Sequence, residues 1–128
     1  MDSSSSFQEL LKDLRRFLPS ERLINDPLRL LAYGTDASFY RLIPKLVVKL
    51  ETENEVIHLL EALAPYGIPV TFRAAGTSLS GQSVTDSVLG VLAWGWKDCR
   101  IEDEGRTIVL QPGVIGGHAN RMLAAHGR

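Results

Sequence analysis

The sequence predicts an α+β fold, in which a small parallel βαβ unit is followed by a mixed, mainly antiparallel sheet. Residues 45–50 (KLVVKL) and 69–73 (PVTFR) have the apolar and β-branched content of strands, and residues 53–66 between them repeat apolar side chains at helical spacing. A strand–helix–strand connection makes its two strands parallel, and we expect them to be neighbours in the sheet. The stretches 100–103 and 106–111 read as strands of the antiparallel part.

Two helices are predicted ahead of the first strand. Ser6 and Glu9 have the spacing of a capping box, and apolar residues follow at helical spacing, so we expect a helix over 7–18 that ends at a proline. Residues 25–27 (NDP) offer a cap followed by a proline in the first helical turn, which predicts a short helix over 28–33.

The later elements follow from caps, turns and periodicity. Thr52 and Glu55 form a second capping box at the start of the βαβ helix. Residues 88–94 are strand-like and are expected in the antiparallel part, where Glu104-Gly105 predicts a tight hairpin. Apolar residues recur on one side of 115–126, which predicts a C-terminal helix.

Composition and charge narrow the possible functions. Fourteen basic residues against fifteen acidic ones give a net charge of -1, which offers no general attraction for nucleic acid or an anionic membrane. The single cysteine, Cys99, cannot form an internal disulfide and is expected to be a half-buried structural thiol. No run of 18 apolar residues predicts a transmembrane helix, and the first residues lack the pattern of a secretory signal, so we expect an intracellular protein.

The segment 72–83 (FRAAGTSLSGQS) carries the most chemical information. It follows a strand and contains small residues, hydroxyls and two glycines, Gly76 and Gly81, which permit backbone angles closed to other residues. Successive N–H groups in such a loop can hold phosphate oxygens. The residues alone leave two interpretations open, a diphosphate-binding loop and a surface connection without a ligand, although the length of the loop favours function.

Two other phosphate-binding motifs fit this segment poorly. Residues 76–83 differ from a P-loop by having Gln82 in place of the lysine that neutralises the phosphates, and a strand rather than a helix is expected after them. The dinucleotide pattern G-x-G-x-x-G is absent, because Ala74 stands two residues before Gly76.

The stretch YGIPVTFRAAGTSLSGQS at 66–83, together with IVLQPGV at 108–114, resembles the FAD-binding domain shared by vanillyl-alcohol oxidase, p-cresol methylhydroxylase and the FAD-linked D-2-hydroxyacid dehydrogenases. The D-lactate, glycolate and D-2-hydroxyglutarate dehydrogenase branch is the most similar. The resemblance implies a p-cresol methylhydroxylase-type (PCMH-type) domain that is incomplete at its C-terminus. Residues 1–44 would be an N-terminal helical segment, and 45–128 the first part of the FAD-binding domain.

In that family the corresponding loop wraps the FAD diphosphate through its backbone N–H groups. The resemblance therefore implies a cofactor-binding set made of small or polar residues of the loop: Ala74, Ala75, Gly76, Thr77, Ser78, Gly81 and Gln82. Some relatives attach the flavin through a histidine at the place of Thr77, so non-covalent FAD is implied here. Lys49-Leu50 departs from the family, which often has a proline after the first strand.

The resemblance also implies a function. The chain would be the FAD-binding portion of a cytoplasmic oxidoreductase, or one peripheral to the inner face of the membrane. It would oxidise a D-2-hydroxyacid such as D-lactate or glycolate, and an iron–sulfur domain is one candidate electron acceptor. Relatives continue well past the position of Arg128, so we expect a fragment without catalytic residues that is isolated without FAD. The alternative is a non-catalytic binding domain that keeps the fold without a cofactor.

Other polar and aromatic residues have structural interpretations. Asp36 is expected to cap a turn rather than act as a base. Arg73 either pairs with the diphosphate or holds the end of its strand, and the sequence favours neither. Trp94 and Trp96 are expected to pack rather than stack on a cofactor. The histidines of the C-terminal helix have no carboxylate or cysteine at metal-binding spacing, so no metal site is expected.

Overall fold

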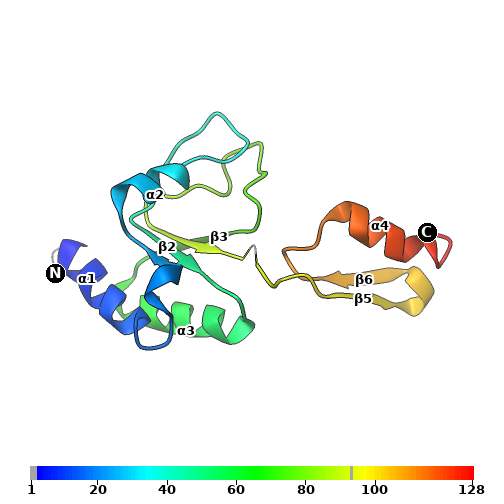
Figure 1. Ribbon diagram of the computed structural model, residues 1–128, viewed down its shortest axis with the longest axis horizontal. Helices are drawn as coiled ribbons and strands as arrows, with labels where there is room; N and C mark the ends of the chain where they lie inside the picture. The colour runs from blue at the N-terminus through cyan, green and yellow to red at the C-terminus, as the bar shows by residue number, and fades with distance from the viewer. Residues whose placement is uncertain (1–2, 93) are drawn as a thin grey trace.

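The structure, a computed structural model, describes residues 3–92 and 94–128, which form two parts (Figure 1). The first is a four-stranded sheet with helices on both faces. The second is an arm in which the hairpin of β5 (Cys99–Glu102) and β6 (Thr107–Leu110) lies beside α4 (Gly116–Ala124). The α+β class predicted from the sequence is confirmed.

The main sheet has the strand order β1-β2-β4-β3. β2 (Leu46–Lys49) and β3 (Val70–Arg73) both run parallel to β4 (Val88–Val91), whereas β1 (Leu23–Ile24) pairs antiparallel with β2. The prediction that the two strands of the βαβ unit are neighbours is therefore wrong, as is the placement of 88–94 in the antiparallel part. All four residues of β4 are buried, and so apolar a strand is most stable in the centre of a sheet covered on both faces.

The sheet separates two apolar clusters. Side chains alternate along β2, so that Leu46 and Val48 pack on one face against α1 (Ser3–Leu14) and α3 (Glu53–Leu63), while Val47 packs on the other. The second face is covered by α2 (Pro27–Ala32) through Leu30. Each fully buried Leu or Val contributes roughly 1.5–3 kcal/mol, and these two clusters fix the positions of the strand ends.

The two N-terminal helices differ in how well the sequence predicts them. α2 begins after Asp26, whose carboxylate accepts a hydrogen bond from Arg29 N–H, and proline fills its first position. α1 begins at Ser3, not at residue 7, so Ser6 lies inside the helix and does not cap it. Serine tolerates helix interiors well enough for a helix to extend through a short serine run when its other end packs on a core.

The predicted capping box of α3 is present in altered form. Thr52 Oγ1 accepts from Glu55 N–H at 3.2 Å, but the Glu55 carboxylate accepts from Glu51 N–H at 2.7 Å rather than from Thr52. The same carboxylate also receives two hydrogen bonds from Arg22, at 2.7 and 2.9 Å. The pair is largely enclosed, with side-chain exposures of 16% for Arg22 and 18% for Glu55. Glu55 thus joins the segment before β1 to the start of α3.

This ion pair gives a pH-dependent prediction. Burial opposes the charge on Glu55. The hydrogen bonds from the Arg22 side chain and from the backbone at Glu51 and Thr52 outweigh this effect and leave the pKa of Glu55 below its ordinary 4.5. A lowered pKa makes the pair's contribution complete at neutral pH and removes it as the pH falls below about 4.5 through the folded-state value. Glu55→Gln should therefore destabilise the chain by about 2 kcal/mol at pH 7.

The loss should be measured by urea unfolding at pH 7 and at successively lower pH. The difference between wild type and Glu55→Gln should shrink as the pH is lowered. Glu61→Gln, on the exposed side of the same helix, is the matched control and should change stability by less than about 0.5 kcal/mol. A difference that stays constant into the acid range would contradict a charged Glu55 as its source.

The arm forms as an antiparallel hairpin, as the sequence predicts, with Glu102 opposite Thr107. Its turn is tight because Asp103, Glu104 and Gly105 all have positive φ. A Cβ at Gly105 would lie 2.6 Å from His126 Cβ, so a glycine is needed where the turn meets the end of the helical segment. Cys99 is half-buried in β5 and forms no disulfide.

Candidate functional site

The loop of residues 74–87 joins the carboxyl end of β3 to β4 and lies beside the segment 33–43 that follows α2 (Figure 1). Side-chain contacts tie the two segments together: Ser83 Oγ donates to Asp36 Oδ2 at 3.0 Å, and the Tyr40 ring lies against Gly81. The carboxyl ends of parallel strands are where α/β sheets bind ligands. All seven residues proposed from the sequence lie in this one loop.

Gly76 and Gly81 shape the loop. Both adopt left-handed backbone angles, with φ of +70° and +75°. Each also has a close neighbour: a Cβ would lie 3.0 Å from Arg73 Cζ at Gly76, and 2.7 Å from Tyr40 Cδ2 at Gly81. Backbone conformation therefore favours glycine at both positions. At Gly81 a Cβ would also collide with the Tyr40 ring, whereas at Gly76 the flexible end of Arg73 would have to shift by a few tenths of an ångström.

The first half of the loop presents unused hydrogen-bond donors. Within residues 3–92 and 94–128, the N–H groups of Ala75, Gly76, Thr77 and Ser78 donate to no acceptor in the chain. Ala75 and Thr77 are exposed, whereas Gly76 and Ser78 are half-buried. A row of free backbone donors on small residues matches the requirement of an anion such as a diphosphate, because backbone groups left without partners need water or a ligand.

The second half of the loop is used internally. Ser78 Oγ accepts hydrogen bonds from Ser80 N–H at 3.3 Å and from Gln82 N–H at 3.1 Å. Gln82 thus helps to close the loop in this conformation, and its own N–H is not a free donor. Its side chain is exposed, and its contact with a cofactor stays a prediction, as do the contacts of the other six residues.

Two residues near the loop have structural contacts. Asp36 Oδ1 accepts from Ser38 N–H at 2.8 Å, which is the turn cap expected from the sequence. Hydrogen bonding by Ser38, and then by Ser83, lowers the pKa of the Asp36 carboxyl, which makes it a poor proton acceptor near neutral pH. Arg73 Nη1 donates to three backbone carbonyls, so its observed role is to hold the end of β3.

Sequence reasoning missed Tyr40. Its ring forms one wall of the loop at Gly81, yet it lies 41 positions earlier, in a segment without periodicity. The carbonyls of Tyr33 and Thr35 that receive Arg73 were missed for the same reason. In this segment the sequence predicted only the turn cap at Asp36.

In the arm, a hollow of about 270 Å³ lies beside the start of α4, between Gly113, Val114, Lys97 and Arg121. Its lining includes Gly113 and Val114, which belong to the stretch 108–114 that resembles the family. Within the described part of the chain, no three His, Cys, Asp or Glu side chains are placed to hold a metal ion. No helix there is long and apolar enough to cross a membrane.

The parallel strands of the main sheet and the glycine-shaped loop after β3 are features of a domain that binds a phosphate-containing ligand. The profile of the FAD binding domain family matches residues 44–128. The chain belongs to this family, and FAD is the cofactor of its domain. The free N–H groups of residues 75–78, on a loop shaped by two left-handed glycines, fit the diphosphate of that cofactor.

Among proteins of known function, the chain is similar to the glycolate oxidase subunit GlcD of Escherichia coli, with 31% identity over 120 residues. The alignment covers 91% of this chain and 24% of that subunit, so the chain spans about a quarter of the length of this relative.

Solved structures share the fold. p-Cresol methylhydroxylase with substrate bound has a TM-score of 0.72 at 13% identity, and the match covers 98% of this chain and 26% of that one. The 4-ethylphenol oxidase of Gulosibacter chungangensis has a TM-score of 0.72 at 18% identity, covering 98% and 25%. An alkyldihydroxyacetonephosphate synthase has a TM-score of 0.72 at 16% identity, and the match covers 94% of this chain and 25% of that one. Since these enzymes carry different names, the fold alone does not identify a reaction.

Proposed function

We propose that this chain is the FAD-binding portion of a flavin-dependent oxidoreductase that oxidises a D-2-hydroxyacid such as glycolate or D-lactate. The observation that carries the proposal is the row of free N–H donors at residues 75–78, on a loop shaped by two left-handed glycines. The similarity to the glycolate oxidase subunit favours a 2-hydroxyacid over the phenolic substrates named for p-cresol methylhydroxylase and 4-ethylphenol oxidase.

This chain's own contribution is to hold the cofactor. The N–H groups of Ala75, Gly76, Thr77 and Ser78 would donate to diphosphate oxygens, while Gly81 and Gln82 close the far side of the loop. Bound FAD supplies the redox chemistry, accepting a hydride equivalent from the carbon that bears the substrate hydroxyl. We place the substrate pocket and the electron acceptor, for which an iron–sulfur domain is one candidate, outside these 128 residues.

The alternative is a binding domain that keeps the fold without a cofactor. Such a domain would have no need for two left-handed glycines at 76 and 81 or for unpaired donors beside them. Membership of the FAD binding domain family also speaks against it.

The proposal predicts a substrate-dependent colour change. The complete protein in which this chain occurs should be purified with yellow, non-covalently bound FAD. Under anaerobic conditions, glycolate or D-lactate should bleach the oxidised flavin absorbance, because the hydroxyacid loses two electrons and two protons to form the 2-oxoacid and reduced flavin. L-lactate is the matched control and should leave the spectrum unchanged.

Each possible failure of this experiment refutes a different part of the proposal. Protein that takes up no FAD when supplied with excess cofactor would refute the binding function. Yellow protein that a panel of D-2-hydroxyacids does not bleach would refute the substrate class and leave the FAD-binding role standing.

A further inference from the structure

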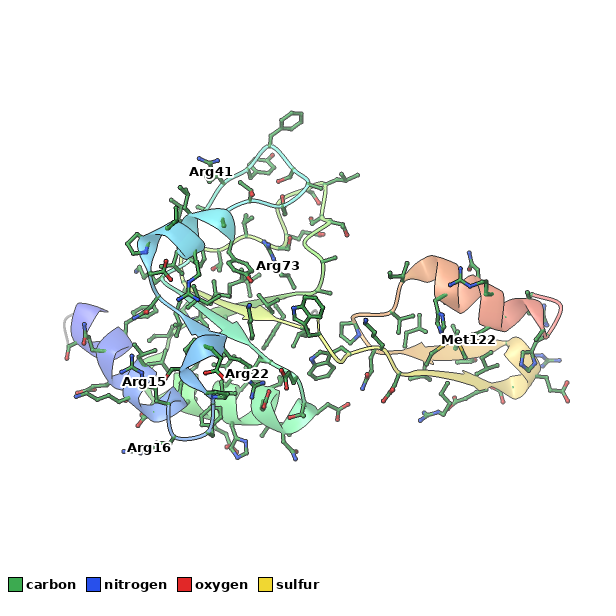
Figure 2. The ribbon with its side chains drawn as sticks, viewed as in Figure 1. Arg15, Arg16, Arg22, Arg41, Arg73 and Met122 are labelled. Atoms are coloured by element: carbon green, nitrogen blue, oxygen red, sulfur yellow. The ribbon has the colours of Figure 1, made fainter. Side chains whose placement is uncertain are left out.

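Arg73, the last residue of β3, connects the loop to the segment after α2. Its Nη1 donates to the carbonyl oxygens of Thr35 at 2.9 Å, Tyr33 at 3.3 Å and Ser83 at 3.4 Å. Its Cζ also lies 5.4 Å from the centre of the Tyr33 ring, at cation–π distance. Figure 2 shows Arg73 between the two segments. The Arg73 side chain therefore ties the start of the loop, its second half at Ser83, and the neighbouring segment into one unit.

The charge of Arg73 is not neutralised within the described residues. Arg22, which is also largely enclosed, has a carboxylate partner in Glu55. Arg73 is held by carbonyl dipoles and an aromatic face alone. Its Nε is buried and has no hydrogen-bond partner in the described chain. Burying a cation in this way is costly, so the position calls for a compensating interaction.

The compensating position is the loop directly beside it. A Cβ at Gly76 would lie 3.0 Å from Arg73 Cζ and 3.2 Å from its Nε, so the guanidinium packs against the backbone that carries the free N–H groups. Residues 74–82 contain no charged side chain. Arg73 is therefore a positive charge located behind an otherwise neutral set of donors.

We propose that Arg73 is a positioning residue for cofactor binding: it fixes the conformation of residues 75–78 and adds positive potential behind them, without forming an ion pair with the diphosphate. The inference rests on the proposed role of the loop. Arg73 raises cofactor affinity through the loop and not by direct contact, because its Nη1 donates to three carbonyls rather than to an anion. A preorganised loop binds more tightly because less conformational entropy is lost on binding.

The test uses Arg73→Gln and Arg73→Lys in the complete protein stripped of FAD. FAD titration should show affinity reduced about a hundredfold for Gln and about tenfold for Lys, which keeps the charge but cannot reach three carbonyls at once. Arg41→Gln is the matched control: it removes one exposed positive charge from the adjacent segment (Figure 2), and FAD affinity should change less than about twofold.

Two further measurements separate positioning from general stability. Hydrogen exchange without FAD should accelerate in both variants at the hydrogen-bonded loop amides of Ser80 and Gln82, while amides of the central strand β4 stay protected. With FAD at saturating concentration, the ³¹P resonances of the diphosphate should shift in Arg73→Gln relative to wild type. A residue that only stabilised the fold would leave these resonances unchanged once the site is filled.

The outcomes distinguish this inference from the proposed function. Wild-type FAD affinity and unchanged ³¹P resonances in Arg73→Gln, with FAD binding abolished by Gly76→Val, would overturn the role of Arg73 and keep the loop as the site. Wild-type affinity in both Arg73→Gln and Gly76→Val would overturn both. If Arg73→Gln does not fold, Arg73→Lys decides through the same three readouts.

Discussion

Gly76→Val should abolish FAD binding by the complete protein while its sheet stays folded. Valine at φ +70° is sterically unfavourable, and its Cβ would lie 3.0 Å from Arg73 Cζ, so the loop backbone is strained and the guanidinium behind it must shift. Its branched side chain would press on the Arg73 guanidinium and displace the backbone whose N–H groups would bind the diphosphate. An affinity loss of a thousandfold or more corresponds to about 4 kcal/mol, within reach of several lost charge-assisted hydrogen bonds.

Gly67→Val is the matched control for backbone strain. Gly67 has a similar φ of +60°, but nothing lies within 4 Å of its Cβ position, and it stands at the turn before β3, away from the loop. Both variants should lose about 1–2 kcal/mol of unfolding free energy to the left-handed conformation, yet only Gly76→Val should lose FAD. Equal FAD affinity in the two variants, measured by fluorescence titration, would remove the loop from the site.

The elements that sequence predicted best are those whose signals are local. α3 combines an N-terminal cap at Thr52 with an apolar stripe that includes Leu59 and Leu63, both within one helix length. The hairpin turn at Asp103–Gly105 is similarly determined by its own residues. Local hydrogen bonds and periodicity act over a few residues and can be read directly from the chain.

Strand order depends on packing that no local pattern encodes. The residues of 88–94 predict a strand, but they do not indicate whether it belongs to the parallel or to the antiparallel part of the fold. Its place between β2 and β3 follows from the two apolar clusters, which leave Val88 and Leu89 without exposed surface on opposite faces. β1 was missed because two residues, Leu23 and Ile24, are too short a run to show alternation.

The candidate site likewise contains one part that the sequence predicts and one part that it does not. Its loop could be found from the small residues and glycines of 74–82, because their conformational freedom is a property of residue type. The groups that hold the loop could not, since Arg73 reaches carbonyls 38 and 40 positions earlier in the chain. A backbone carbonyl carries no side-chain signature, so only the folded arrangement reveals these contacts.

Trp96 links the arm to the main sheet. Its side chain is 5% exposed, and its Nε1–H donates to the carbonyl oxygen of Leu50, just after β2, at 2.7 Å. Its own carbonyl accepts from Gly113 N–H at 2.7 Å, and a Cβ at Gly113 would lie 2.5 Å from that oxygen. The expected packing role thus holds for Trp96, whereas the expectation for Trp94 is wrong, because its side chain is 67% exposed.

Trp96→Ala should therefore cause the largest loss of stability of any substitution considered, about 3–5 kcal/mol. The cost combines a lost aromatic contact with a Leu50 carbonyl left without its donor. Trp96→Phe keeps most of the volume and should lose about 1–3 kcal/mol, the part due to the unpaired carbonyl. Trp94→Ala is the matched control, and its effect should stay below about 0.5 kcal/mol.

Urea unfolding of the 128-residue chain, followed by far-ultraviolet circular dichroism, measures all three variants without relying on tryptophan fluorescence. Hydrogen exchange should show where stability is lost. An isolated two-stranded hairpin is marginal in water, so amides 99–110 should become unprotected in Trp96→Ala before those of β2 and β4. Equal losses for Trp94→Ala and Trp96→Ala, or an arm that stays protected without Trp96, would show that another contact holds the two parts together.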